Sequence, residues 1–257
     1  MKVTLIGSGN VATVLGRKIT AAGHLVQQVF SPNDQHAREL ATKLQGEPIS
    51  DWKKINQDAD LYIVAISDPQ LLQITDHILH FRKTIVHTSG SVPMEVLKPV
   101  SKNYGILYPL QSLRKELKSI PEITMLVNGN SRETLTLIYD FAKTIAKRVE
   151  AADDIARLKL HLAAVIVNNF SNHLYSLAED YCKTEGVDFR LLFPLIEETA
   201  NRLRNSSPKE LQTGPAFRRD EKTIQKHLEL LRHNPELKKV YLALTESIAK
   251  FYSQARV

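Results

Sequence analysis

The hydrophobic positions of the first 150 residues fall into short continuous runs, and stretches with a helical pattern separate these runs. The runs that predict strands cover residues 3–6, 25–30, 60–66, 84–87, 104–108 and 123–127, and the first two helices are expected over 10–22 and 34–44. A continuous apolar run indicates a strand that is buried on both faces of a sheet. Alternation of such strands with helices predicts a doubly wound, mostly parallel α/β sheet.

The pattern changes after residue 150, where the strand signals stop. Asp153 or Asp154 can cap a long helix that ends at Gly186, and another helix is expected over 188–204 with a kink or break at Pro194. Eight of the ten glycines, which mark tight turns between strands and helices, lie in the first 130 residues. These differences predict two domains, an α/β domain over residues 1–150 and an all-helical domain over residues 151–257.

Composition and charge exclude several classes of protein. Hydrophobic residues make up 43% of the chain and charged residues 24%, as in ordinary globular domains. The single cysteine, Cys182, excludes an intrachain disulfide and predicts the reducing cytoplasm. The net charge of +6 is dispersed over both halves, so nucleic-acid binding is not expected. The uncharged stretch 160–178 carries histidines and asparagines that would be costly in a bilayer, so a membrane span is not expected either.

The most informative motif is a glycine-rich turn that directly follows the first strand and opens the first helix. It reads Gly7-Ser8-Gly9-Asn10-Val11-Ala12. In this pattern the first glycine permits the tight turn, the second lets the backbone approach a pyrophosphate, and the small last residue lets the helix pack close to the sheet. The free N–H groups at the helix start attract the phosphates. We therefore expect all six residues to form a dinucleotide-binding turn, and a strand–helix turn without a ligand is the less favoured alternative.

The end of the second strand bears on which dinucleotide is bound. Sites that prefer NAD usually carry an acidic residue there, but here Ser31 and Asn33 could donate hydrogen bonds to a 2′-phosphate. This pattern favours NADP over NAD, although Asn33 could also simply cap the next helix. Ligands of open α/β sheets lie outside the carboxyl ends of the strands. The residues expected there to border the ribose and the nicotinamide, or alternatively to form an ordinary turn, are Ala65, Ile66, Ser67 and Asp68.

Polar residues form a stripe along the predicted long helix. At 3.6 residues per turn, His161, Asn168 and Asn172 share one face among apolar neighbours. Buried amides and imidazoles need partners, which could be a substrate and a cofactor or could be another helix or subunit. In the first case His161 would donate a proton while Asn168 and Asn172 orient the substrate. Further substrate-binding candidates are Ser89, Gln111 and Asn169. In the second case the stripe is a hydrogen-bonded seam.

Several motifs occur as an ordered set along the chain. They are the turn 7–12, His-Thr-Ser-Gly-Ser (87–91), Tyr-Pro-Leu-Gln (108–111), Leu-His-Leu-Ala-Ala (160–164) with Asn-Asn-Phe-Ser-Asn-His (168–173), and Gln-Thr-Gly-Pro-Ala (212–216). With these motifs the chain resembles the NADP oxidoreductases that join a Rossmann-like domain to a helical C-terminal domain, a family related to pyrroline-5-carboxylate reductase and the β-hydroxyacid dehydrogenases. The resemblance covers nearly the whole chain. It implies an NADP-binding domain, a helical dimerisation domain and a substrate cleft between them.

The glycine-rich turn and the polar stripe lead to the hypothesis of an NADP-dependent oxidoreductase that transfers a hydride to or from a small carbonyl or imine substrate, whereas the resemblance itself implies no substrate. The β-hydroxyacid dehydrogenases carry a lysine and an asparagine four positions apart on the interdomain helix, but here Lys159 is followed at that spacing by Ala163. This departure keeps an alternative open, a non-catalytic NADP-binding regulatory or scaffold protein. The resemblance and the long apolar helix predict a homodimer formed through the helical domain, and no residue spacing predicts a metal site.

Overall fold

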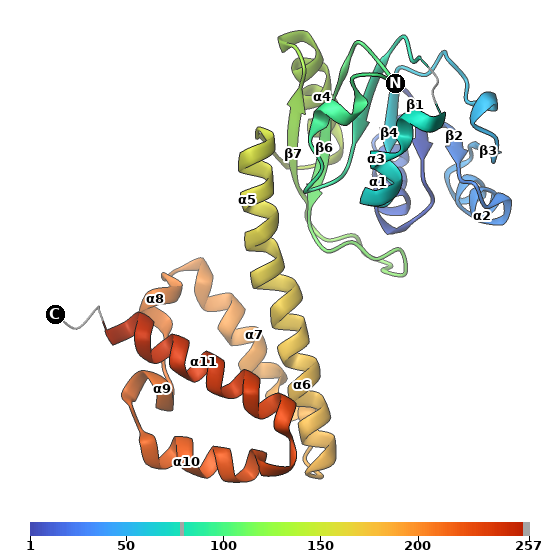
Figure 1. The fold of residues 1–257 in the computed structure, drawn as a ribbon. Helices are drawn as coiled ribbons and strands as arrows, with labels where there is room; N and C mark the ends of the chain where they lie inside the picture. Colours follow the sequence, from blue (N-terminus) through green and yellow to red (C-terminus); the bar gives the residue numbers. More distant parts are fainter. Residues whose placement is uncertain (78–79, 254–257) are drawn as a thin grey trace. The chain divides into compact units, whose positions relative to one another are not determined.

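The computed structural model describes residues 1–77 and 80–253 and divides the chain into two compact units, Met1–Phe170 and Ser171–Val257 (Figure 1). The first unit contains all eight strands, and the described residues of the second form helices joined by turns and loops. The last strand ends at Ala151, next to the predicted domain boundary, whereas the two compact units divide further along the chain, within a continuous helical stretch. The predicted boundary at residues 150 and 151 stays a prediction.

One eight-stranded sheet organises the first unit, with the order β3-β2-β1-β4-β5-β6-β7-β8. Only the β6–β7 pair is antiparallel. The strands are β1 (Lys2–Ile6), β2 (Leu25–Phe30), β3 (Glu47–Ile49), β4 (Leu61–Val64), β5 (Thr84–His87), β6 (Tyr104–Leu110), β7 (Thr124–Gly129) and β8 (Arg148–Ala151). The strand order reverses between β1 and β4, and ligands of such sheets bind in the crevice that this reversal opens.

The predicted mostly parallel α/β sheet is confirmed, but two of its strands, β3 and β8, were not predicted from the sequence. β3 has only three residues and contains Pro48, and β8 has four residues of which three are exposed. Neither segment has the continuous apolar run that marked the other strands, because both lie at the edges of the sheet. Edge strands bury less of their surface, so their sequences carry a weaker pattern.

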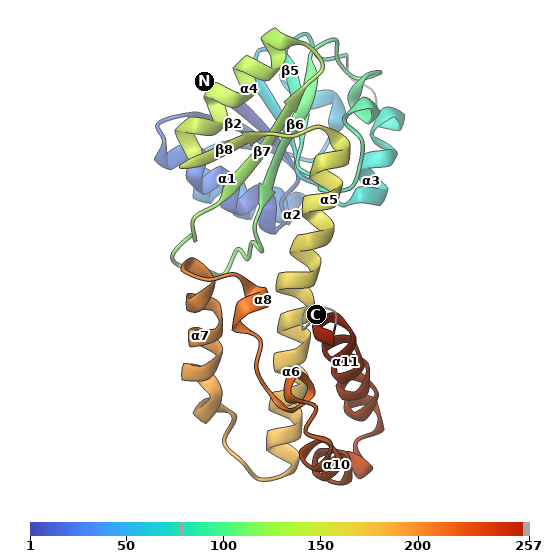
Figure 2. The same cartoon turned by 90° about the vertical axis from the view of Figure 1, so that its left-hand side faces the viewer.

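Helices and short 3₁₀ segments cover the two faces of the sheet (Figure 2). One face packs against α1 (Asn10–Ala21), α2 (Asp34–Leu44) and α4 (Arg132–Ile145). The other packs against α3 (Asp68–Leu72) and 3₁₀ segments that include Ile74–His77 and Met94–Leu97. Each fully buried leucine or isoleucine in these layers contributes about 1.5–3 kcal/mol, so the sheet forms a rigid platform for the residues at its carboxyl edge.

The predicted long helix is interrupted by a π-helix. Helix α5 (Asp154–Ala164) continues into the π-helical segment Val165–Phe170 and then into α6 (Ser171–Thr184). The Asp153 carboxylate caps α5 by accepting the Ala156 N–H at 2.7 Å. A π-turn has more residues than an α-turn and therefore rotates the following residues around the axis. The single stripe expected from 3.6 residues per turn is accordingly broken between α5 and α6, and π-segments occur often at functional sites.

The second unit consists of α6 and five further α-helices among its described residues, of which α11 is longer than α6. They are α7 (Phe193–Asn201), α8 (Pro208–Leu211), α9 (Pro215–Arg218), α10 (Glu221–Leu230) and α11 (Pro235–Ser253). The predicted helix over 188–204 is instead a 3₁₀ turn, α7 and a second 3₁₀ turn. Pro194 lies in the first turn of α7, where its missing N–H costs no hydrogen bond, so it starts a helix and does not kink one.

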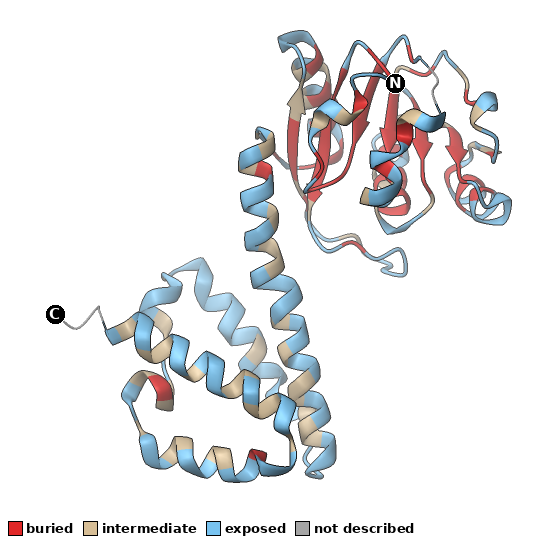
Figure 3. Ribbon diagram, viewed as in Figure 1, coloured by how far each residue is buried: buried red, intermediate tan, exposed pale blue. Residues whose placement is uncertain are grey.

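Burial differs sharply between the two units (Figure 3). Among the described residues of the second unit, only Ala216 and Leu231 are buried. The long helix itself is not buried in the single chain, because large apolar side chains such as Leu162, Val167 and Phe170 are more than half exposed. Across residues 1–77 and 80–253, no helix combines the length and apolar character that crossing a membrane would require.

Candidate functional site

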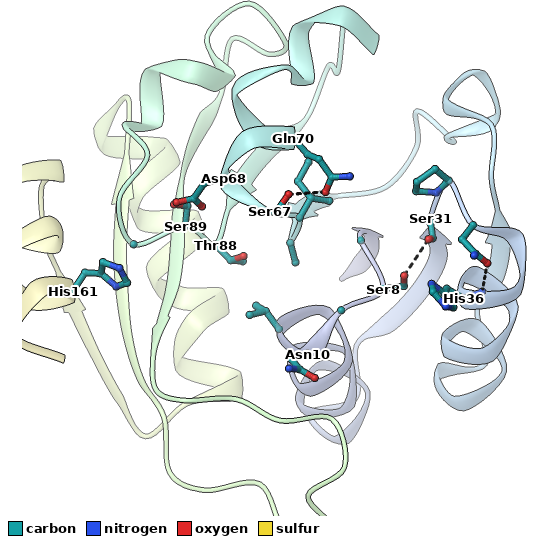
Figure 4. Close-up of a pocket in the computed structure, with 18 residues that line it drawn as sticks. Ser8, Asn10, Ser31, His36, Ser67, Asp68, Gln70, Thr88, Ser89 and His161 are labelled. Atoms are coloured by element: carbon teal, nitrogen blue, oxygen red, sulfur yellow. Dashed lines mark hydrogen bonds between the residues drawn. The ribbon is translucent and has the colours of Figure 1, made fainter. Parts of the chain in front are cut away.

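A cavity of about 520 Å³ lies at the carboxyl ends of β1, β2, β4 and β5 (Figure 4). Its volume is in the range of ligand pockets. The residues that line it are Gly7, Ser8, Gly9, Asn10, Val11, Ser31, Pro32, Asn33, His36, Ala65, Ile66, Ser67, Asp68, Gln70, Thr88, Ser89, Gly90 and His161. Every residue expected to bind the cofactor is in this set except Ala12, which is fully buried. We call this the first cavity.

The two glycines of the turn have different steric surroundings. Gly7 has a φ of +123°, and a Cβ added there would lie 2.2 Å from the Ala65 carbonyl oxygen. No other residue fits that position without moving the backbone of Ala65, the residue after β4. Gly9 has extended backbone with φ −79°, and an added Cβ would meet nothing within 4 Å. Gly7 is therefore required by the fold, whereas Gly9 leaves open space in the wall of the first cavity.

The turn and the start of α1 have the features that a pyrophosphate requires. The Gly9 carbonyl accepts the first helical hydrogen bond from the Thr13 N–H at 2.9 Å, so the N–H groups before Thr13 at the helix start have no helical partner. The first turn of α1 contains no acidic residue that would repel a phosphate. Ala12 is buried against the sheet and allows the close approach of helix and strand that the motif predicts. These residues therefore fit a dinucleotide.

The far end of the first cavity lies beyond β2. Ser8 Oγ donates to Ser31 Oγ at 3.0 Å, and the Asn33 side-chain oxygen accepts the His36 N–H at 3.1 Å (Figure 4). Asn33 therefore caps α2, the alternative left open by the sequence, and lines the cavity as well. The nearest acid, Asp34, is paired with Arg38 at 2.6 Å and is absent from the lining. This end of the cavity thus presents hydroxyl, amide and imidazole groups.

The opposite end of the first cavity lies at the loop after β5. Ser91 Oγ donates to Asp68 Oδ2 at 2.5 Å, which joins this loop to the start of α3. Ser89 Oγ accepts the N–H groups of Ser91 and Val92 at 3.2 and 3.1 Å, so its hydroxyl forms the turn 89–92. Figure 4 shows His161 at this end and the group of Ser31 and His36 at the other.

His87, the last residue of β5, is fully buried and lines neither of the two cavities described in this section. Its Nδ1 accepts the Ser89 N–H at 3.2 Å, so the proton is on Nε2, which donates to the Pro93 carbonyl at 3.3 Å. Burial, aided by the positive charge of Arg157, lowers the pKa of His87 to about 4. His87 is therefore a neutral packed histidine that supports the turn 89–92.

An ion pair fixes the start of α5 to the same loop. The Arg157 side chain is 1% exposed, pairs with Asp154 and donates to the Val92 carbonyl. The other oxygen of the Asp154 carboxylate accepts the Met94 N–H at 3.1 Å. A buried charge is tolerated only when it is paired and hydrogen-bonded. These contacts hold the first turn of α5 against residues 92–94, and His161 follows one turn later.

A second cavity, of about 460 Å³, lies between the end of β6 and the α5–π segment. Its lining consists of Tyr108, Leu110, Gln111, Ser112, Leu160, His161, Ala163, Ala164, Val165, Val167, Asn168 and Asn169. His161 lines both cavities. Most of the wall is apolar, and its polar groups are amides, hydroxyls and the imidazole. Asn172, expected to work with His161 and Asn168, lines neither cavity and falls in the second compact unit.

Most of the residues predicted to bind the substrate line one of these two cavities. Asn168 and Asn169 line the second cavity, which the π-helix allows although they are consecutive. Gln111 lines it too, but its amide nitrogen donates to the Glu122 carbonyl at 3.0 Å and its oxygen accepts the Ser112 N–H at 2.9 Å. The Gln111 side chain therefore holds its own loop, and Ser89 lines the first cavity instead of the second.

Sequence reasoning missed several lining residues. Those of the first cavity are Pro32, His36, Gln70, Thr88 and Gly90. Most adjoin predicted site residues, so their positions beside Asn33 and Ser89 were the available signal. The more consequential omission is Tyr108, whose hydroxyl is 2.9 Å from His161 Nδ1. Its place in the Tyr-Pro-Leu-Gln motif was visible, but only the fold pairs two residues 53 positions apart.

Comparison with known proteins places the chain in a family. A Rossmann-like domain model matches residues 1–111, and a model described as a domain of unknown function (DUF2520) matches residues 123–248. A crystal structure from Bacteroides fragilis, described as a "putative NADP oxidoreductase", is 37% identical with a TM-score of 0.90, and the match covers 97% of this chain and 98% of that one. The fold and turn define a Rossmann-like protein. More particularly, the chain belongs to the family that joins a Rossmann-like domain to a DUF2520 domain.

Two more distant structures share the fold. A pyrroline-5-carboxylate reductase from Streptococcus pyogenes is 14% identical with a TM-score of 0.63, covering 97% of this chain and 98% of that one. A reductive aminase from Aspergillus terreus, in complex with NADPH and ethyl-5-oxohexanoate, is 17% identical with a TM-score of 0.69, covering 99% and 94%. A search of curated protein sequences found no match.

The buried neutral state of His87 makes stability depend on pH. Its pKa is about 4 in the folded chain and about 6.5 in an unfolded one, so between these values the unfolded state binds more protons. The free energy of unfolding is therefore expected to fall as pH drops from about 6.5 towards 4, by up to about 1.4 kcal/mol per pH unit. Urea denaturation of the wild type and His87→Gln across this range measures the effect. The variant should show a shallower fall, and parallel profiles would contradict the assignment.

Proposed function

We propose that this protein is an NADP-dependent oxidoreductase that transfers a hydride to or from a small carbonyl or imine substrate. The observation that carries the proposal is that two cavities of the first unit share one titratable side chain, His161, and that one of them is built on a dinucleotide-binding turn. The names of the similar structures, an NADP oxidoreductase and a reductive aminase in complex with NADPH, support a general NAD(P)-dependent oxidoreductase.

The first cavity would hold the nucleotide. The turn 7–12 and the start of α1 would bind the pyrophosphate through backbone N–H groups, with Gly9 providing the space for its approach. Ser31, Asn33 and His36 can donate hydrogen bonds to a 2′-phosphate, and no carboxylate from the segment after β2 lines the cavity. This set of donors favours NADP over NAD. When bound, the reduced cofactor would supply the hydride.

The second cavity would hold the substrate. Leu110, Leu160 and Val167 provide apolar contact, while Asn168 and Asn169 provide amide groups that can orient a carbonyl or imine. Reduction adds a hydride to the carbon of the C=O or C=N bond and a proton to its oxygen or nitrogen. His161 lies where both cavities meet and is the group we assign as the proton donor.

A second candidate function is NADP binding without turnover, in a regulatory or scaffold protein. The feature that favours it is the pair Lys159 and Ala163, which departs from the lysine and asparagine of the β-hydroxyacid dehydrogenases. Lys159 is exposed and lines neither cavity, so it does not take the role of the catalytic lysine of those enzymes. The two functions share the first cavity and differ in whether the second one supports chemistry.

We also propose that the second unit forms the interface of a cytoplasmic homodimer. Its described helices expose large apolar side chains, including Leu191, Leu195 and Leu203, and bury almost none. A helical unit with so little core needs another surface to cover it. The single cysteine suits a reducing compartment. Analytical ultracentrifugation at micromolar concentration should show a dimer, and a sedimentation coefficient of a monomer would contradict this proposal.

The cofactor assignment predicts selective thermal stabilisation. NADP⁺ or NADPH at about 100 times its Kd should stabilise the fold by about 2.7 kcal/mol, which raises the Tm by several degrees, and NAD⁺ at equal concentration should do less. Gly9→Ala should abolish most of the shift while leaving the nucleotide-free Tm nearly unchanged, because its Cβ enters only open space. Gly7→Ala is the matched contrast, since its Cβ collides with Ala65 and should lower the Tm itself. An unchanged shift in Gly9→Ala would contradict the assignment.

The proton-donor assignment predicts a loss of turnover. His161→Gln should lower kcat for NADPH oxidation with small ketones and cyclic imines by about 10²–10⁴-fold, since the amide cannot exchange a proton, and should change NADPH affinity by less than about threefold. His173→Gln is the control, because His173 lies on α6 and lines neither cavity. If NADPH binds but no compound in a broad panel is reduced, the regulatory or scaffold function is favoured instead.

A further inference from the structure

Tyr108 is the side chain most closely tied to His161. It stands near the end of β6, is 9% exposed, and lines the second cavity. Its hydroxyl is 2.9 Å from His161 Nδ1, and the two rings meet edge to face with centroids 5.9 Å apart. Among the described residues His161 Nε2 makes no hydrogen bond, so the two ring nitrogens are in different environments.

Gly90, in the loop after β5, leaves space for the Tyr108 and His161 rings. A Cβ added at Gly90 would lie 2.7 Å from His161 Nδ1 and 3.0 Å from Tyr108 Cζ. Real Cβ atoms almost never approach other atoms that closely, so any other residue at position 90 would force the His161 ring, the Tyr108 ring or the loop to move. The space exists only because residue 90 lacks a side chain, and the first turn of α5, anchored by Arg157, brings His161 into it.

The direction of the hydrogen bond follows from burial. Burial raises the pKa of the Tyr108 hydroxyl; the positive charge of Arg157 opposes this effect and the Asp68 carboxylate adds to it. The phenol therefore keeps its proton in neutral solution. In the resting neutral ring the phenol donates to Nδ1, which leaves the single ring proton on Nε2. When the imidazole is protonated, the same phenol oxygen can accept from Nδ1–H.

We propose that Tyr108 is a positioning residue that acts through His161, holding Nδ1 in either protonation state so that the proton exchanged with the substrate is the one on Nε2. Under the proposed function, the doubly protonated ring gives its Nε2 proton to the substrate oxygen or nitrogen while a hydride adds to the substrate carbon. Immediately after the transfer the ring carries its one proton on Nδ1, which donates to the Tyr108 oxygen, until uptake of a solvent proton at Nε2 restores the doubly protonated ring. No atom of Tyr108 is consumed in this step.

The ring proton can be located by NMR of protein labelled with ¹⁵N in its histidine rings, at about pH 8.5, where ordinary imidazoles are neutral. His161→Gln identifies the His161 signals by their loss. In the wild type, Nδ1 should give the signal of an unprotonated nitrogen and Nε2 that of a protonated one. Tyr108→Phe, which removes only the hydroxyl, should give a mixture of both tautomers, and Gly90→Ala should do the same by separating the rings.

Tyr104→Phe is the matched control. Tyr104 lies on the same strand, is 8% exposed and lines neither cavity, so its loss should leave the His161 signals unchanged. In turnover, Tyr108→Phe should lower kcat by roughly 10–100-fold, the range seen when metal-bound histidines lose the hydrogen-bond partner that orients them, with the KM for NADPH nearly unchanged. Tyr104→Phe should keep kcat.

The NMR signals test the positioning role of Tyr108, and turnover tests the proposed oxidoreductase function, so either can be contradicted without the other. A wild-type ring protonated on Nδ1, or identical His161 signals in the wild type and Tyr108→Phe, would overturn the positioning role whether or not the protein reduces any substrate. If the ring signals behave as expected but no substrate is reduced, the proposed oxidoreductase function fails while the positioning of His161 by Tyr108 stands.

Discussion

The buried side chain of Arg157 is the constraint on which the candidate site depends. A guanidinium that is 1% exposed is stable only when paired, and removing one partner of a buried ion pair typically costs about 3–5 kcal/mol. Its partners, Asp154 and the Val92 carbonyl, tie the first turn of α5 to the loop after β5. Its Nε finds no hydrogen-bond partner among the described residues, a cost that most buried groups avoid. The unpaired Nε therefore belongs to the same side chain that orients α5, the helix that carries His161.

Three glycines complete this arrangement, each for a different physical reason. Gly7 turns the chain where a Cβ would collide with the backbone of Ala65, Gly9 leaves the wall of the first cavity open, and Gly90 makes room for the Tyr108–His161 pair. The carboxyl edge of the sheet thus forms most of the wall of the first cavity. Helix α5 contributes His161 at one end of this cavity. Under the proposed function, nucleotide binding and proton transfer would therefore depend on different elements, because the turn 7–12 and His161 are far apart in the chain.

The sequence was most informative where burial is complete. The apolar runs of β2 and β5 and the span of α2 were predicted with their observed bounds, and the turn 7–12 located the first cavity. β3 and β8 were missed because edge strands lack that pattern. The stripe of His161, Asn168 and Asn172 assumed regular α-helix, and the π-helix at Val165–Phe170 broke it. No local pattern could reveal the contact of Tyr108 with His161, since it depends on the register of β6 and the anchoring of α5.

The proposed function requires that His161 stands where a bound nucleotide meets a substrate. A crystal structure of the protein with NADP⁺ tests it most directly, through the distance from nicotinamide C4 to the His161 ring. We expect the pyrophosphate on the turn 7–12, the 2′-phosphate near Ser31 and Asn33, and the nicotinamide beside Gly90 with C4 facing the second cavity. A nucleotide bound outside the first cavity, or bound there with its nicotinamide remote from His161, would contradict it.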